Sequence, residues 1–160
     1  MRGDIILFAS VGKWTDRIIV WADKDHGKFV HVEIDLGDGK SIGEHTAGLL
    51  IHNTPTQPGV VFVSLKHIPS SEIEHGLLWA TQFAARPLER REYGWLDIAA
   101  DALKIVGLPH VPGIPSQMDC SDFVYQYLNR VGAVPKADRG RDPATISPND
   151  IARMFGIPTK

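Results

Sequence analysis

The sequence predicts an α+β fold in which a small antiparallel sheet or half-barrel is followed by helices that pack against it. Residues 4–8, 29–36 and 59–65 have the composition of strands, and residues from about 71 onward show helical periodicity. The two parts meet near residue 68 without a linker-like stretch. With 160 residues, of which 43% are hydrophobic and 22% are charged, the chain has the composition of one globular domain. We therefore expect a single domain over residues 1–160.

The clearest strand signal is the alternation of apolar and polar side chains along residues 29–36. One face would carry Val30, Val32, Ile34 and Leu36, and the other would carry His31, Glu33 and Asp35. The turn signal at residues 37–40 would return the chain through residues 41–44. Residues 4–8 and 59–65 add further strands, so a small, largely antiparallel sheet is expected.

Helices are expected in the second part of the chain. The first spans residues 71–85, where Ser71 and Glu74 have the spacing of a capping box, and the second spans residues 93–106. After a proline-rich loop at residues 108–118, a third helix opens at residues 119–122 and ends near Gly132. Ser147, which a proline follows, is the expected N-cap of a short fourth helix.

Charge and composition argue against two classes of partner. The chain has 17 Lys and Arg residues against 19 Asp and Glu residues and no basic stripe, which argues against nucleic acid. No stretch reaches the roughly eighteen apolar residues of a membrane span, so neither a transmembrane helix nor a signal peptide is expected. Such a protein would be cytoplasmic, associated with a phage or virion, or exported by another route.

Cys120 is the single cysteine of the chain, so it cannot form an internal disulfide. Its expected place in the first turn of a helix would lower the pKa of the thiol, because unpaired amides and the helix dipole favour the thiolate. The carboxylates of Asp119 and Asp122 would raise the pKa of the thiol unless they cap the helix or face away. Position alone leaves both a nucleophilic thiol and a buried core cysteine open.

A thiol nucleophile needs a base, and His31 is the first candidate among the seven histidines. It lies inside a strand but on the polar face, where packing does not account for it. A third polar group would hold the imidazole in the right tautomer, and Glu44 is the first candidate, with Glu33 and His45 as alternatives. No ligand spacing such as His-Glu-x-x-His appears, so we expect neither a metal nor another cofactor.

Three sequence blocks together resemble the signature blocks of the NlpC-type papain-fold cysteine peptidases. They are RGDIILF, FVHVEIDLGDGKSI and QMDCSDFVYQYL. Here His31 precedes Cys120 by 89 residues, whereas the cysteine comes first in the common members. This order resembles the circularly permuted branch, which includes YiiX-like proteins and relatives of lecithin-retinol acyltransferase. The resemblance covers most of residues 2–128 and implies a papain-like fold.

The resemblance also implies roles for individual residues. Cys120 matches the nucleophile, His31 the general base and Glu44 the polar third residue. Tyr93 resembles a tyrosine that lines the site and helps the oxyanion hole, although a core aromatic residue remains the alternative. The other residues that would line the substrate site are Asp119, Ser121 and Glu33.

The implied activity is cysteine-dependent hydrolysis of an amide, with a bacterial cell-wall peptide as the substrate. Permuted members also include enzymes suspected of acting on lipid acyl groups, and residues 49–51, Trp14 and Trp21 would offer an apolar surface for that alternative. A catalytically idle binding module of the same fold is the third possibility. Glu33 departs from the family, which commonly has a small residue two positions after the histidine, and this departure puts the shape of the substrate in doubt.

Overall fold

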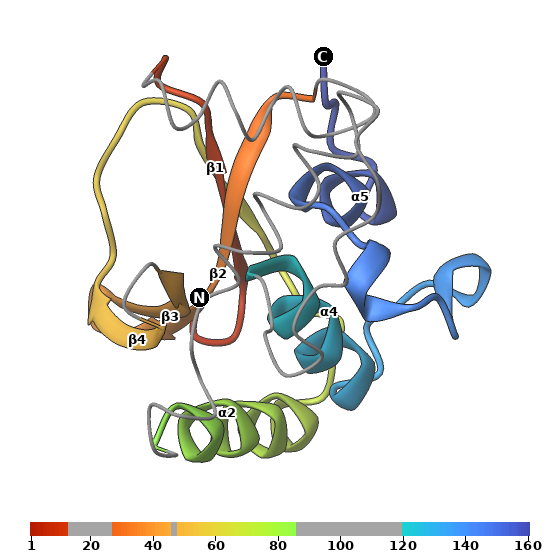
Figure 1. Ribbon diagram of the computed structural model, residues 1–160. Helices are drawn as coiled ribbons and strands as arrows, with labels where there is room; N and C mark the ends of the chain where they lie inside the picture. The colour runs from red at the N-terminus through yellow and green to blue at the C-terminus, as the bar shows by residue number, and fades with distance from the viewer. Residues whose placement is uncertain (13–26, 46–47, 86–119) are drawn as a thin grey trace, which may run out of the picture.

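The computed structural model describes residues 1–12, 27–45, 48–85 and 120–160. Within these ranges five strands form one open antiparallel sheet, with three helices packed against it (Figure 1). The strands are β1 (Ile5–Ala9), β2 (Phe29–Gly37), β3 (Lys40–His45), β4 (Gly48–Asn53) and β5 (Val60–Val63). The sheet order is β4-β3-β2-β1-β5, so β2 has a neighbour on either side. The expected α+β class is confirmed, and the sheet is open.

The pairing of β1 with β2 contains a β-bulge that the alternation along residues 29–36 did not predict. Phe8 lies opposite His31 and Ala9 lies opposite Phe29, so Val30 is the extra residue of β2. The expectation that Val30 shares a core face with Val32 was therefore wrong. Phe29 joins the core instead, while Val30 is buried outside that cluster.

The turn between β2 and β3 forms as the sequence predicts. Asp38 and Gly39 both have positive φ angles, of 53° and 70°, which suit the two central positions of a type I′ hairpin turn. The sequence did not predict β4, which pairs with β3 and forms one edge of the sheet. Leu49 of β4 is buried, whereas Leu50 and Ile51 are 37% and 48% exposed.

Helix α2 (Ser70–Ala84) begins one residue earlier than expected and without the expected capping box. Its N-cap is Pro69, whose carbonyl accepts hydrogen bonds from the amides of Glu72 and Ile73, and no side chain caps the helix. Ser71 therefore lies inside the first turn, where its hydroxyl cannot act as the N-cap. Gly76 lets α2 approach α4 closely, because a Cβ there would come within 2.7 Å of the Tyr127 ring.

Helices α4 (Cys120–Arg130) and α5 (Pro148–Met154) confirm the two remaining predictions in the described part of the second half. After α4 the chain passes through Gly132, which has a φ of 73°. Ser147 and Asp150 form the capping box of α5, with the hydroxyl accepting from the Asp150 amide at 3.1 Å. The expected helix over residues 93–106 lies outside the described residues.

One apolar core joins the helices to one face of the sheet. Helix α4 contacts β2, β3 and α2, and α5 contacts β2. The strands contribute Leu7, Phe29, Val32, Ile34 and Ile42 to this core, and the helices contribute Leu77, Phe123, Leu128 and Ile151. None of the described helices is long and apolar enough to cross a membrane.

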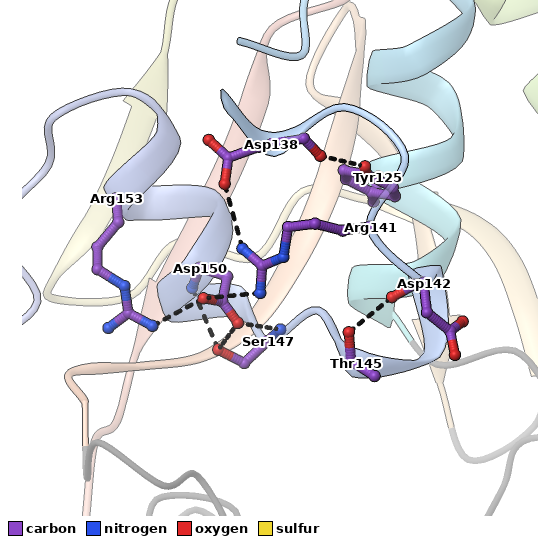
Figure 2. Close-up of polar contacts among 8 residues, drawn as sticks. All are labelled: Tyr125, Asp138, Arg141, Asp142, Thr145, Ser147, Asp150 and Arg153. Carbon is purple, nitrogen blue, oxygen red and sulfur yellow. Dashed lines mark hydrogen bonds and ion pairs between the residues drawn. The ribbon is translucent and has the colours of Figure 1, made fainter. Parts of the chain in front are cut away.

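The segment between α4 and α5 is held by polar contacts (Figure 2). Tyr125 of α4 donates its hydroxyl to the carbonyl of Asp138 at 2.6 Å. Arg141 forms ion pairs with Asp138 and Asp150, and Arg153 bonds Asp150 from the following turn of α5. These contacts hold residues 138–141 against α4 and α5.

Candidate active site

A buried carboxylate on β2 joins two histidines. Glu33 is fully buried, and its Oε1 lies 2.9 Å from Nε2 of His31 and 3.2 Å from Nε2 of His52. The two imidazoles are less buried, with 22% and 25% of their side chains exposed. A carboxylate in such a place needs hydrogen-bond donors, because burying an unpaired charge is costly.

The strand register explains how three residues from two separated strands meet. His31 and Glu33 are two residues apart on β2, so they share a face. His52 lies on β4, with β3 between it and β2. The side chain of Glu33 crosses β3 at Gly43, where a Cβ would come within 2.5 Å of Glu33 Cγ. Glycine at position 43 therefore lets the Glu33 carboxylate reach β4.

On β1, the described neighbours of His31 and Glu33 are apolar. Its ring lies 5.6 Å from the ring of Phe8, the residue opposite it on β1. Ile6 lies opposite Glu33 and is fully buried. Ile6 and Phe8 are outside the core that the helices cover, because they project from the other face of the sheet. The His31 imidazole is thus held between an aromatic ring and a buried acid.

Glu44, the first candidate for the third polar residue, is also buried but projects from the other face of the sheet. Along β3 it shares a face with Ile42, a core residue, whereas Gly43 lies under Glu33. Among the described contacts, the carboxylate that bonds His31 is Glu33. Two features of the sequence could have indicated Glu33. Position 33 carries a glutamate where a small residue was expected, and position 43, beside it on the next strand, is a glycine.

Cys120 is the first residue of α4 and is buried. It belongs to the same apolar core as Val32 and Ile34, which alternate with His31 and Glu33 along β2. The thiol therefore packs on the helix side of the sheet, and His31 projects from the opposite side. Ser121 is buried beside Cys120 in the first turn. Tyr93, Asp119 and the side chain of His45 lie outside the described residues.

Hydrogen bonds connect α4 to β2 through Gly3. Tyr127 donates its hydroxyl to the carbonyl of Gly3, and the Gly3 amide donates to the carbonyl of Asp35, near the end of β2. Cys120 lies two helical turns, about 10 Å, before Tyr127. Helix α4 also contacts β2 directly (Figure 1).

The charge closest to Cys120 in sequence among the described residues is that of Asp122. Its Oδ1 accepts a hydrogen bond from Gln126, one turn further along α4. Burial, together with the nearby charge of Asp142, raises the pKa of Asp122, although the bond from Gln126 lowers it. The Asp122 carboxylate thus accepts a hydrogen bond from within α4.

Within the described ranges no group of three or more His, Cys, Asp or Glu side chains is arranged to hold a metal ion. The Ser41 hydroxyl, buried on β3 opposite His52, has no hydrogen-bond partner among the described residues.

No model of a known protein family, no curated protein sequence and no solved structure matches the chain.

Proposed function

We propose that the protein is a cysteine-dependent amide hydrolase with Cys120 as the nucleophile, His31 as the base and Glu33 as the acid that orients His31. The observation that carries this proposal is the 2.9 Å hydrogen bond between the buried Glu33 carboxylate and Nε2 of His31. An ionised carboxylate only accepts hydrogen bonds, so it fixes the tautomer with the proton on Nε2. In a neutral ring, Nδ1 is then the basic nitrogen that takes the proton of a thiol.

The chemistry assigned to these residues is acyl transfer. The Cys120 thiolate attacks the amide carbonyl carbon, and the amide N–H of Cys120, at the start of α4, stabilises the oxyanion. Protonated His31 gives its proton to the leaving amine as the C–N bond breaks, which leaves a thioester on Cys120. Water that gives a proton to His31 then attacks the thioester and releases the acid and the thiol. Tyr93 would add a second oxyanion contact.

The resemblance of the three sequence blocks supports a bacterial cell-wall peptide as the substrate. The lipid acyl alternative gains one observation, because Leu50 and Ile51 are exposed on the edge strand β4. Sedimentation with anionic liposomes at low salt tests it, with Leu50→Ser/Ile51→Ser as the variant. Binding that the double substitution removes would favour a lipid substrate, and the absence of binding would leave the peptide.

A catalytically idle binding module is the second candidate function, and the faces of β2 favour it. Cys120 packs with Val32, whereas His31 projects to the other side of the sheet. In an idle module the thiol and the imidazole act independently. The hydrolase instead requires that the start of α4 brings the Cys120 thiol within hydrogen-bond distance of Nδ1 of His31.

Alkylation of Cys120 by iodoacetamide separates the two functions without a known substrate. A hydrolase is expected to react rapidly at about pH 6, where an ordinary thiol is protonated, and His31→Ala should slow it by about a hundredfold. Glu33→Gln should also slow the reaction, whereas the exposed His67 provides the control variant His67→Ala. Slow alkylation that is the same in His31→Ala would overturn the hydrolase and leave the binding module.

A further inference from the structure

We infer that Asp38 is a site of covalent modification, at which the folded protein forms isoaspartate through a cyclic imide with the backbone of Gly39. This modification is independent of the proposed function. Asp38 and Gly39 are the only Asp-Gly pair in the sequence, and they form the turn between β2 and β3. Asp38 is also the one non-glycine residue with a positive φ in the described part of the chain.

The reaction needs only the protein and water. The backbone nitrogen of Gly39 attacks the side-chain carbon Cγ of Asp38, and the side-chain hydroxyl leaves as water together with the hydrogen of that nitrogen, which closes a succinimide ring. A water molecule then opens the ring at one of its two carbonyls. Opening at Cγ restores aspartate, whereas opening at the backbone carbonyl of residue 38 gives isoaspartate, whose main chain runs through Cβ and Cγ.

The surroundings of Gly39 leave room for this ring. Glycine has no Cβ to hinder the attack, and a Cβ built at position 39 would meet no atom within 4 Å. The Gly39 carbonyl accepts a hydrogen bond from the Thr54 amide at 2.8 Å. The Gly39 amide itself donates no hydrogen bond within the described ranges. The attacking nitrogen is therefore accessible.

The side chain of Asp38 is exposed and free to rotate toward that nitrogen. Among the aspartates that the structure describes, Asp38 is the one whose carboxylate makes no hydrogen bond or ion pair. Each of the others accepts at least one hydrogen bond, which opposes such a rotation. They are Asp4, Asp35, Asp122, Asp138, Asp142 and Asp150. Asp142 also precedes a proline, whose nitrogen has no hydrogen to lose.

Isoaspartate does not fit the turn in which it forms. Its main chain has one more carbon atom than that of aspartate. The positive φ angles of Asp38 and Gly39 suit a type I′ turn, which matches the twist of the two strands that it joins. The extra atom should therefore loosen the pairing of β2 with β3, which begins at Gly37 and Lys40.

Ageing of the full chain in its folded state tests the modification. After several weeks at neutral pH and physiological temperature, trypsin releases residues 29–40, which contain Asp35 and Asp38, and residues 142–153, which contain Asp142 and Asp150. Electron-transfer fragmentation should locate isoaspartate at residue 38, with about tenfold more in the first peptide than in the second. Equal amounts in the two peptides, or none at residue 38, would overturn the assignment.

Two controls sharpen this result. The free peptide of residues 29–40 is incubated beside the protein, and isoaspartate in the peptide alone would show that the folded turn protects Asp38, which overturns the assignment. Asp38→Glu keeps the charge but needs a larger ring to cyclise. Isoaspartate in residues 29–40 of this variant should fall to what Asp35 alone produces, and an unchanged amount would overturn the assignment to Asp38.

Urea unfolding measures the effect on the hairpin. The isomerised fraction, separated from the aged protein by ion exchange, should unfold at a lower urea concentration than the unmodified fraction. Equal midpoints would overturn the expected loosening of β2 and β3.

Discussion

Gly43 lies directly beneath the side chain of Glu33, so closely that a Cβ at position 43 would come within 2.5 Å of Glu33 Cγ. A distance below 3 Å requires one of the two groups to move, and Glu33 is held in place by His31 and His52. The glycine on β3 and the glutamate on β2 are therefore complementary. Together they allow the Glu33 side chain to pass over β3 and reach β4.

Gly43→Ala is expected to displace Glu33 and weaken both of its hydrogen bonds to histidine. Overpacking of this kind destabilises a protein by about 1–3 kcal/mol, which urea unfolding measures. The matched control is the double variant Glu33→Ala/Gly43→Ala, which removes the Cγ and Cδ atoms nearest to the added methyl and leaves the Cβ of residue 33 at 3.3 Å. The alanine at position 43 should cost less in the Glu33→Ala background than in the wild type, and an equal cost in both would contradict the complementarity.

Local chemistry made much of the fold predictable. The hairpin turn follows from Asp38 and Gly39, the α5 boundary from Ser147 and its following proline, and the β2 strand from strict alternation. The places that escaped prediction depend on tertiary contacts. The bulge at Val30 is set by pairing with β1, and β4 depends on pairing with β3 as an edge strand.

The candidate site shows the same division. The places of His31 on a strand and of Cys120 at the start of a helix were predictable from the sequence. That the two act together stays a prediction. The strand register was needed to choose Glu33 over Glu44 as the acid that bonds His31. Side chains alternate along β3, so Glu44 lies on the core face with Ile42. His52 could not be found from spacing, because a separation of 19 positions from Glu33 gives no hint that the two meet across Gly43.

Two serines that look alike in the sequence should behave differently on substitution. Ser147→Ala removes the capping hydroxyl of α5 and should lower the free energy of unfolding by about 1 kcal/mol. Ser71→Ala lies inside α2 at an exposed position and should change stability by less than about 0.5 kcal/mol. Urea unfolding of both variants measures the difference. An equal loss in the two would mean that Ser71 caps α2 after all.

Asn149→Ala should be the more damaging change in α5. The buried Asn149 amide accepts from the Phe29 backbone N–H at 2.9 Å and donates to the Phe29 carbonyl at 2.8 Å. Removing it leaves two buried backbone groups without these partners, which costs about 2–4 kcal/mol in all. Exchange of the Phe29 amide hydrogen should accelerate with the loss of stability. Asn149→Asp would set a carboxylate oxygen against the Phe29 carbonyl and should also be destabilised. Exchange of the Phe29 amide no faster in Asn149→Ala than in the wild type would contradict the role of this hydrogen bond.

Asp150 should make the stability of the protein depend on pH in the acid range (Figure 2). Burial alone would raise the pKa of Asp150, but hydrogen bonds from Arg153 and Ser147 and the charge of Arg141 outweigh it and lower the pKa below the usual 3.8. A carboxyl group whose pKa is lower in the folded state stabilises that state above its unfolded pKa. This contribution is lost as the pH falls through about 4 and below.

Asp150→Asn should therefore lower the free energy of unfolding by about 1–2 kcal/mol at neutral pH and have a smaller effect at about pH 3. Urea unfolding at both pH values measures the two differences. The exposed Glu72 supplies the control, Glu72→Gln, which should change the stability little at either pH. A loss in Asp150→Asn that is as large at about pH 3 as at neutral pH would show that the charge of Asp150 does not stabilise the fold, and that its hydrogen-bonding shape alone does.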